Sequence, residues 1–362
     1  MNNIKKTHRK HKKRRIPKRY FIIAGLIMMA CGLGAWLFYE VSDLKPADIW
    51  YETKAPVTSA VSLPKDDAPH QTKMEWWDYS GHLNSKTGKK YSFHYTIFLI
   101  TGLTSQMVGH VSLNDYQTGQ QYTDQRKLDA DSSVSAVNRF DFTLGNWIMK
   151  RQNEADELKV NSKNFSFKLN LTSTLPPVIH GNNGLIQMSL TDSGYYYSRT
   201  RMPVSGWVRS GKKLETVEGI AWFDHQWGDF LTGKLAWDRF NLQLDDGADI
   251  MIYNLRDKAN QSMHSIVSYT QNGLTELLSH SDFTLTPGAK WISPRSGIAY
   301  PIEWNIKIPK KNIAITTRSI IDNNEFDATV TTYNTYWEGA VDVKGTNTGR
   351  GFMELSGHTS KP

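Results

Sequence analysis

The sequence predicts an all-β protein, with two successive antiparallel β-barrel or sandwich domains after a single N-terminal transmembrane helix. Three observations predict this class. Short segments of alternating apolar and polar residues are separated by Gly, Asn and Pro, as expected of antiparallel strands. Aromatic residues make up 12% of the chain, with 12 Trp and 16 Tyr, which favours sheets with large apolar faces. A chain of 362 residues is also long enough for two domains.

The excess positive charge of the chain lies at its N-terminus. Ten of the 43 Lys and Arg residues fall within residues 1–20, where no acid occurs, so the remaining 33 are outnumbered by the 35 acidic residues. The net charge of +8 therefore does not extend to the body of the protein. Because nucleic-acid binding needs a basic surface, no nucleic-acid partner is expected. We predict that residues 1–20 form a basic cytoplasmic tail.

An uncharged apolar run follows this tail directly. The run FIIAGLIMMACGLGAWLF covers residues 21–38 and spans roughly 27 Å at the helical rise, enough for a bilayer core. We predict a transmembrane anchor over 21–39 in a bacterial inner membrane, with the N-terminus cytoplasmic and the body periplasmic. A lipoprotein signal at Cys31 and an ordinary cleaved signal are the alternatives. Cys31 is the only cysteine, so no internal disulfide can form.

Two domains are expected beyond the anchor. Residues 40–73 carry four prolines and little periodicity, which predicts a linker. Period-two patterns begin after it and continue to the end of the chain. We place an N-terminal domain at 74–232 and a C-terminal domain at 233–362, because each half contains its own series of short strands.

Individual strands follow from alternation and turn residues. In YSFHYTIFLI, residues 91–100, one face is apolar throughout, and both faces are apolar at the end. Further candidates are FSFKLNL, GLIQMSL and GYYYSRTRM in the first half, and EWNIKI, NIAITTR, YWEGAVDVKG and GFMELSG in the second. The sequences DDG at 245–247 and QNG at 271–273 predict the turns of two hairpins.

The densest group of polar and aromatic residues is GIAWFDHQWGDF, at 219–230. Strand alternation puts His225 and Trp227 on one face, and Asp224 with Trp222 on the other. We expect a ligand-proximal strand end in which His225 and Trp227 face the cavity and Asp224 orients the imidazole or the loop. The alternative is a core-facing Asp224 with His225 facing solvent. The glycine at 228 indicates that the strand bends or ends nearby.

The strand WDRFNLQL, residues 237–244, carries an acid on its apolar face. Asp238 alternates with Phe240 and Leu242, whereas Arg239 lies on the other face. If Asp238 is held in a pocket, desolvation raises its pKa and makes it a proton donor near neutral pH. The alternative is an acid at a strand end that is hydrogen-bonded to a loop or paired with an arginine.

Other reaction classes lack their motifs. No G-x-S-x-G is present, and the single cysteine lies in the predicted anchor, so serine and cysteine hydrolase chemistry is not expected. Without H-x-H, H-E-x-x-H or C-x-x-C, we expect no metal site, and no cofactor is indicated. The aromatic residues predict at least one cavity with aromatic walls, to which we assign Trp77, Tyr197, Trp222, Trp227 and Trp237.

Several motifs occur in the order found in a known family. EWWDYSGHL with YSFHYTIFL, GYYYSRTRMPVSG, GIAWFDHQWGDF, WDRFNLQLDDGADIMIYNLR, WISPRSGIAYPIEW, YWEGAVDVKG and GFMELSGH resemble the AttH and carotenoid 1,2-hydratase family, from about Met74 to His358. The W-x-D-H-x-W-G element at 222–228 is the most specific of them. The resemblance implies paired lipocalin-like domains with a ligand site between or within them.

For the hydratase branch, the resemblance implies addition of water to a terminal isoprenoid double bond. Such a reaction needs a proton donor, aromatic faces that stabilise a carbocation, and a positioned water. The candidate catalytic residues are Asp224, His225, Asp238 and Tyr253. The Tyr-x-Asp pattern of the branch is interrupted here, because Leu255 follows Tyr253 two positions on. Asp238 is therefore the predicted substitute for that acid.

Two functions are expected from the sequence. The first is a membrane-anchored lipocalin-like protein that binds an apolar lipid or isoprenoid, with an export or transporter system as a candidate partner. In that case Asp224 and His225 only lock the domain junction. The second is a hydro-lyase or isomerase-like enzyme that acts on an isoprenoid by acid catalysis. Binding is the preferred expectation, because kinship of fold does not transfer a reaction.

Overall fold

The computed structural model describes residues 61–359, except 103, 131–137, 190–191, 231–235 and 258–260. These residues all belong to one unit, Lys54–Pro362. The predicted tail and anchor, and the linker up to residue 60, lie outside the described residues. In the part of the chain that is described, no helix has the length and apolar character needed to cross a membrane. The elements there are nearly all strands, which confirms the all-β class.

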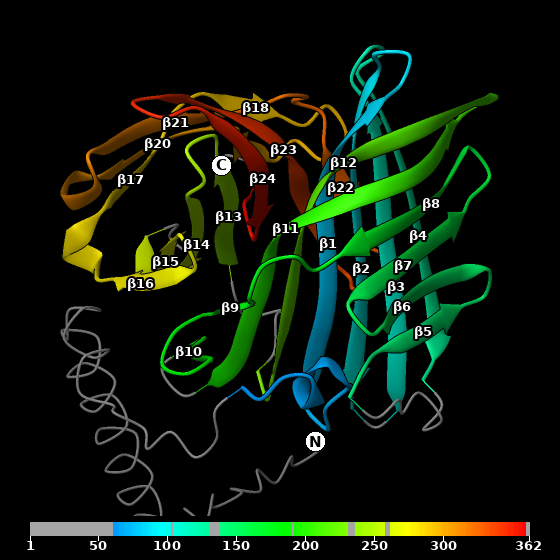
Figure 1. Ribbon diagram of the computed structural model, residues 1–362, viewed down its shortest axis with the longest axis horizontal. Coiled ribbons are helices and arrows are strands. Elements are labelled where there is room, and N and C mark those ends of the chain that lie inside the picture. The colour runs from blue at the N-terminus through cyan, green and yellow to red at the C-terminus, as the bar shows by residue number, and fades with distance from the viewer. Residues whose placement is uncertain are drawn as a thin grey trace, which may run out of the picture. The chain divides into compact units, whose positions relative to one another are not determined.

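The first half of the described chain forms a 12-stranded antiparallel sheet, drawn in blue to green in Figure 1. Its main order is β4-β3-β2-β1-β12-β11-β8-β7-β6-β5, with β9 and β10 paired to β11. Arg126 of β4 donates to the carbonyl of Leu144 in β5 at 3.0 Å, so the two ends of the curled sheet meet. The strands are β1 (Met74–Ser85), β2 (Lys90–Thr101), β3 (Ser105–Asp115), β4 (Gln120–Asp129), β5 (Asp141–Leu144), β6 (Trp147–Gln152), β7 (Ala155–Asn161), β8 (Phe165–Thr172), β9 (Val178–Ile179), β10 (Leu185–Gln187), β11 (Ser193–Ser210) and β12 (Lys213–Gly228).

The second half forms a 10-stranded antiparallel sheet, drawn in yellow to red in Figure 1. Its main order is β16-β15-β14-β13-β24-β23-β21-β20-β17, with β22 paired to β23, and β18 and β19 form a separate ribbon. The strands are β13 (Ala236–Leu244), β14 (Asp249–Arg256), β15 (Ser262–Gln271), β16 (Leu274–Leu278), β17 (Thr284–Pro287), β18 (Lys290–Ile292), β19 (Ala299–Pro301), β20 (Glu303–Ile308), β21 (Ile313–Ser319), β22 (Glu325–Asp327), β23 (Thr335–Gly345) and β24 (Gly349–Ser356).

The two predicted hairpins are confirmed. Residues 245–248 join β13 to β14, with Gly247 at a φ of 88°. Asn272 and Gly273 join β15 to β16 with φ values of 53° and 77°, the two positive angles that a type I′ turn requires. The predicted strand end at 228 is also confirmed, because β12 stops there. Three short 3-10 helices complete the described elements: η1 (Lys65–Asp67), η3 (His280–Asp282) and η4 (Pro309–Lys311).

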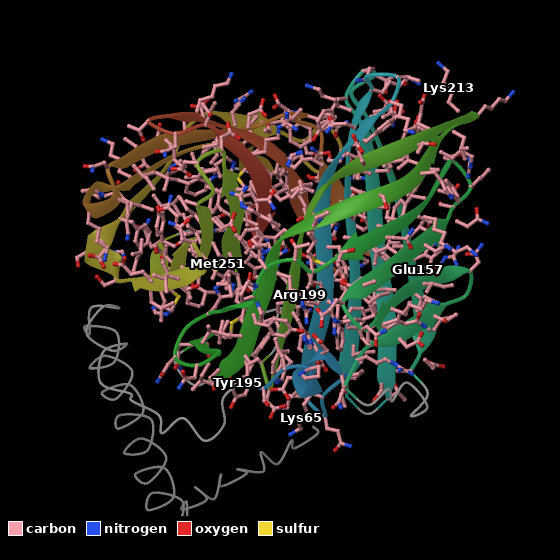
Figure 2. The ribbon with its side chains drawn as sticks, viewed as in Figure 1. Lys65, Glu157, Tyr195, Arg199, Lys213 and Met251 are labelled. Atoms are coloured by element: carbon pink, nitrogen blue, oxygen red, sulfur yellow. The ribbon has the colours of Figure 1, made fainter. Side chains whose placement is uncertain are left out.

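Each sheet curls around a core of its own. Alternate residues of β1 and β12, including Trp77, Tyr79 and Phe223, point into the first core, and Phe240, Trp304 and Trp337 belong to the second. The intervening residues of β1 and β12 point the other way, toward the second sheet. A third apolar cluster lies there: Met74, Trp76, Ile186, Met188, Tyr196, Trp222, Phe230, Trp237, Met251, Tyr253, Leu255 and Ile266. Figure 2 places one member, Met251, on the second sheet. Because the sheets pack outer face to outer face, β1 and residues 221–228 of β12 are buried on both sides.

Candidate functional site

A cavity of about 540 Å³ lies between the two sheets, within the usual range of a small-molecule site. One part of its wall is aromatic or aliphatic: Met74, Trp76, Phe98, Ile100, Trp237, Tyr253 and Tyr336. Another part is polar: Asp78, His94, Thr96, Gln106, His110, Gln226, Arg239, Glu338 and Glu354. The loop between β22 and β23 contributes residues 331–334. Such a cavity is suited to an apolar molecule that presents one reactive or polar part.

Six ionisable residues meet at the polar wall or directly behind it, and we call them the inter-sheet cluster: Asp78, His94, Asp224, Arg239, Glu338 and Glu354. Three come from the first sheet (β1, β2 and β12) and three from the second (β13, β23 and β24). Arg239 is the centre of the cluster. Its guanidinium pairs with Asp78, lies 3.0 Å from Asp224 and 2.9 Å from Glu354, and is 3.9 Å from Glu338.

His94 is the second base of the inter-sheet cluster. Its Nε2 atom lies 2.8 Å from Asp78 Oδ1 and 3.0 Å from Glu338 Oε2. The Thr96 hydroxyl donates to Asp78 Oδ1 at 2.6 Å. Asp78 therefore receives donors from three sides, whereas Glu338 has the single close contact with His94 and the long one with Arg239.

Burial and charge determine the protonation of these groups. Burial raises the pKa of Glu338, and with the negative charge of Asp78 it outweighs the opposing effect of His94, so the pKa rises to about 7. Burial alone would raise the pKa of Asp78, but Arg239 and then His94 lower it below its usual range. Burial alone would lower the pKa of His94, but Glu338 and Asp78 raise it to about 10. Burial also raises the pKa of Glu354.

The cluster contains four carboxyl groups and two bases, so it holds more acid than its own positive charge can neutralise. Asp78, Asp224 and Glu338 are buried, and the side chain of Glu354 is 16% exposed. Because an unpaired carboxylate is strongly disfavoured in such surroundings, the raised pKa favours a proton on Glu338 up to about pH 7. A carboxylic acid on the wall of a largely apolar cavity can act as a general acid.

Comparisons with known proteins agree with this architecture. The AttH-like family matches residues 54–358. The chain belongs to the AttH-like family. A search of curated proteins found no match.

Solved structures resemble this family member over most of its length. An AttH protein of Nitrosomonas europaea has 27% identity and a TM-score of 0.77, over 83% of this chain and 98% of that one. Kievitone hydratase of Nectria haematococca has 15% identity and a TM-score of 0.69, over 84% and 94%. CghA with Sch210972 has 10% identity and a TM-score of 0.54, over 79% and 88%. At such low identities, the last two share only the fold.

Two of the site residues predicted from the sequence lie on the cavity wall, namely Trp237 and Tyr253. Asp224 belongs to the inter-sheet cluster, but its carboxylate is fully engaged. It accepts hydrogen bonds from Ser198 at 2.5 Å, Trp222 at 2.7 Å, Arg239 at 3.0 Å and Asn241 at 2.7 Å. Since two of these donors lie on β13, Asp224 joins the sheets. Trp222 lies in the apolar cluster beside it rather than on the cavity wall.

Asp238 does not reach the cavity, because strand alternation points it into the second sheet. Its carboxylate is 2.8 Å from Arg256 Nε and 2.8 Å from His358 Nε2, and Asn254 donates to it at 3.2 Å. Of the two interpretations of the sequence, the structure agrees with the paired acid. The substitution of Asp238 for the missing acid of the hydratase branch has no support in this arrangement.

His225 and Trp227 share a face, as predicted, but it is the inner face of the first sheet. His225 stacks on Trp77, with ring centroids 4.4 Å apart, and its Nδ1 lies 3.2 Å from the Tyr197 hydroxyl. Thus Trp77, Tyr197, His225 and Trp227 form a group on the opposite side of β12 from the inter-sheet cavity. The alternative of a solvent-facing His225 also fails, because both faces of β12 are buried here. Gln226, between them, lines the cavity instead.

Sequence reasoning missed His94, Arg239, Glu338 and Glu354 as a site. A signal was present in YWEGAVDVKG, where Glu338 alternates with the core residues Trp337 and Val341. Alternation alone would place that acid in solvent. It becomes a site residue because the first sheet covers this face.

Proposed function

We propose that this chain binds an apolar small molecule in the inter-sheet cavity and transfers a proton from Glu338 to a carbon–carbon double bond of that molecule. Water addition or double-bond migration then follows. The observation that carries the proposal is Glu338 itself, a buried acid on the cavity wall whose pKa is raised to about 7 by burial and by Asp78. A proton donor of this kind is active near neutral pH.

The proposed reaction begins when Glu338 gives its proton to one alkene carbon, and the π electron pair forms the new C–H bond. The positive charge on the other carbon faces a wall that includes Trp76, Trp237 and Tyr253, and aromatic rings attract cations. A water oxygen then bonds to this carbon and releases one proton to the Glu338 carboxylate, so alkene and water give an alcohol. In double-bond migration, a carbon next to the cation instead loses a proton to the Glu338 carboxylate, and the electron pair of that C–H bond forms the new double bond.

The other members of the inter-sheet cluster hold Glu338 in place. Arg239 and His94 keep Asp78 ionised, and the Asp78 charge in turn favours the protonated form of Glu338. His94 fixes the orientation of the Glu338 carboxyl through the 3.0 Å contact. Asp224 is proposed to act only in joining the sheets.

Two further points support the proposal. Among the structures of the same fold, one is a hydratase by name, kievitone hydratase. Much of the wall of the inter-sheet cavity is also aromatic or aliphatic, which suits an apolar ligand. We propose in addition that the predicted anchor holds the protein at a membrane, where apolar molecules collect.

The test uses the full chain, incubated in deuterated water with the lipid extract of the cells from which it is isolated. Mass spectrometry of the extract should reveal a species with carbon-bound deuterium, and water labelled with heavy oxygen should distinguish hydration from migration. Glu338→Gln should abolish both labels, whereas Glu303→Gln, the same change on β20, should retain them.

The opposite result would be a ligand recovered without label from the wild type and from Glu338→Gln alike. The chain would then be a carrier, and the inter-sheet cluster would have a purely structural role.

A further inference from the structure

A second group of ligating side chains lies away from the inter-sheet cavity, on the inner face of the first sheet. His70 precedes β1, Glu75 belongs to β1 and His225 belongs to β12. Glu75 Oε1 lies 2.7 Å from His70 Nδ1 and 2.8 Å from His225 Nε2. One carboxylate oxygen therefore stands between two imidazole nitrogens, and the ligand atoms of all three residues lie within 4.8 Å of one another.

His225 is held in place on both sides of its ring. Its Nε2 atom faces Glu75 Oε1 at 2.8 Å, and its Nδ1 atom lies 3.2 Å from the Tyr197 hydroxyl, which in turn donates to Asp67. The ring is fully buried against Trp77 and Trp227, which fixes its orientation toward Glu75. A divalent cation can replace the protons that lie between the carboxylate oxygen and the imidazole nitrogens.

We propose that His70 Nδ1, Glu75 Oε1 and His225 Nε2 bind a divalent metal ion of the zinc type. Two imidazoles and one carboxylate form a donor set of known zinc sites that leave a fourth position open. His70 is 23% exposed, so the proposed site lies near the protein surface. The ion would fasten the segment before β1 to the inner face of the sheet. This proposal is independent of the proposed function.

The surroundings of the ligands fit a metal site. Ligating histidines usually donate their other nitrogen to an outer partner that fixes the ring. His225 has Tyr197 and, behind it, Asp67, and His70 Nε2 lies 3.6 Å from Asp66. Glu75 is held too, because its second oxygen accepts the backbone N–H of His70 at 2.7 Å.

The two contacts that Glu75 makes need only a small adjustment to hold a metal ion. With zinc–ligand bonds of about 2.0–2.1 Å, tetrahedral ligand atoms stand roughly 3.3 Å apart, about half an ångström more than the present contacts. His70 lies outside the strands and can move by that amount. The other group of this kind among the described residues, Asp78, His94 and Glu338, belongs to the inter-sheet cluster, where the Arg239 guanidinium already lies beside both of its carboxyl groups.

Cobalt is the probe for the test, because tetrahedral Co²⁺ absorbs visible light strongly. The untagged full chain is stripped with a chelator and titrated with Co²⁺ and then Zn²⁺. We expect one equivalent of Co²⁺ to give the tetrahedral spectrum and Zn²⁺ to remove it. His70→Asn and His225→Gln should abolish the spectrum, whereas the exposed His280→Asn and Glu338→Gln at the other cluster should retain it. Tyr197→Phe should weaken the affinity by about 10–100-fold.

Thermal unfolding provides a second measurement and a control for folding. Zn²⁺ should raise the unfolding midpoint of the wild type and leave that of His70→Asn unchanged, since this change lies outside the sheet and preserves the circular dichroism spectrum. The proposal is overturned if the wild type gives no tetrahedral spectrum, or if the spectrum survives in His70→Asn and His225→Gln.

Discussion

Two buried ionic clusters of this protein differ in their balance of charge. Inside the first sheet, Arg151 and Arg199 pair with Asp67 and Asp156, and we call these four residues the plug cluster. Arg199 lies 2.6 Å from Asp67, and Arg151 lies 3.2 Å from Asp67 and 2.8 Å from Asp156. Figure 2 shows Arg199 on β11. Here two guanidinium groups meet two buried carboxylates, and Arg151 also pairs with the exposed Glu154 at 3.0 Å.

The inter-sheet cluster has four carboxyl groups for Arg239 and His94. In the plug cluster each buried carboxylate has a guanidinium partner, although burial still raises the pKa of Asp156, and the cluster borders the aromatic core rather than the inter-sheet cavity. The unbalanced cluster lines that cavity and must hold a proton. An excess of buried acid, more than burial or pairing by itself, therefore distinguishes a site for proton transfer from a structural ion network.

The largest effect is expected for Arg239→Leu. Removing this guanidinium leaves Asp78, Asp224 and Glu354 without their shared partner, and breaking a buried pair on one side costs about 3–5 kcal/mol. Urea unfolding at neutral pH should therefore show a lower free energy of unfolding by that amount. The loss should shrink in acid, where the carboxylates become protonated.

Two matched variants test whether the position of the arginine matters. Arg199→Leu in the plug cluster should destabilise the fold to a similar degree, since it also leaves a buried acid. The half-exposed Arg318→Ala should change the free energy of unfolding by no more than about 1 kcal/mol. Equal effects of Arg239→Leu and Arg318→Ala would show that the inter-sheet cluster is not held by Arg239.

The next effect concerns the stability of Glu338→Gln as a function of pH. In the unfolded chain this glutamate ionises from about pH 4.5, whereas in the folded chain it stays protonated up to about pH 7. Between these values, ionisation favours the unfolded state, so the wild type loses stability as the pH rises. By pH 7, the free energy of unfolding of the wild type should have fallen by about 3 kcal/mol relative to that of Glu338→Gln.

Chemical denaturation of both proteins at several pH values between 4.5 and 7 measures this difference. Glu303→Gln serves as the control, and its free energy of unfolding should depend on pH in the same way as that of the wild type. If the curves of the wild type and Glu338→Gln are parallel, Glu338 has an ordinary pKa, and the two buried clusters do not differ in the way described above.

A smaller effect is expected for His94→Gln. The positive charge of His94 opposes the rise in the pKa of Glu338, so its removal should raise that pKa further, by about one unit. The pH of half-maximal deuterium transfer should move upward accordingly. His110→Gln is the matched control, because burial lowers the pKa of His110 to about 3 and leaves it uncharged in the same cavity. A downward shift for His94→Gln would contradict the assigned charges.

The smallest effect concerns the loop over the cavity. The Thr331 hydroxyl lies 2.8 Å from His110 Nε2 and 2.6 Å from Gln125 Oε1, and so ties the second sheet to β3 and β4. Thr331→Val should lower the free energy of unfolding by about 1 kcal/mol and speed the release of a bound fluorescent fatty acid. The exposed Thr329→Val should do neither. Unchanged release would mean that this loop does not retain ligands.

Much of the fold could be predicted because its signals are local. The turns at 245–247 and at Asn272 and Gly273 need particular residues, and alternation in β13 correctly separated Asp238 from Arg239. Alternation also separated Asp224 from His225. These features depend on neighbours along the chain or across one hairpin.

The site could not be predicted in the same way, because it forms where two sheets pack. Nothing near Glu338 in the sequence indicates that His94 will lie 3.0 Å away, or that the outer face of β23 is covered. The motif at 222–228 attracted attention through its density of polar and aromatic groups. Its two faces serve different purposes, since Asp224 joins the sheets and His225 lies in the first core.

Infrared difference spectroscopy of the full chain as the pH is changed, with the wild type beside Glu338→Gln, observes the proton on Glu338 directly. We expect a carbonyl band of a protonated carboxylic acid in the wild type that disappears with a midpoint near pH 7 and is missing in Glu338→Gln. A band that is the same in both proteins, or a Glu338 signal that titrates near pH 4.5, would contradict this expectation.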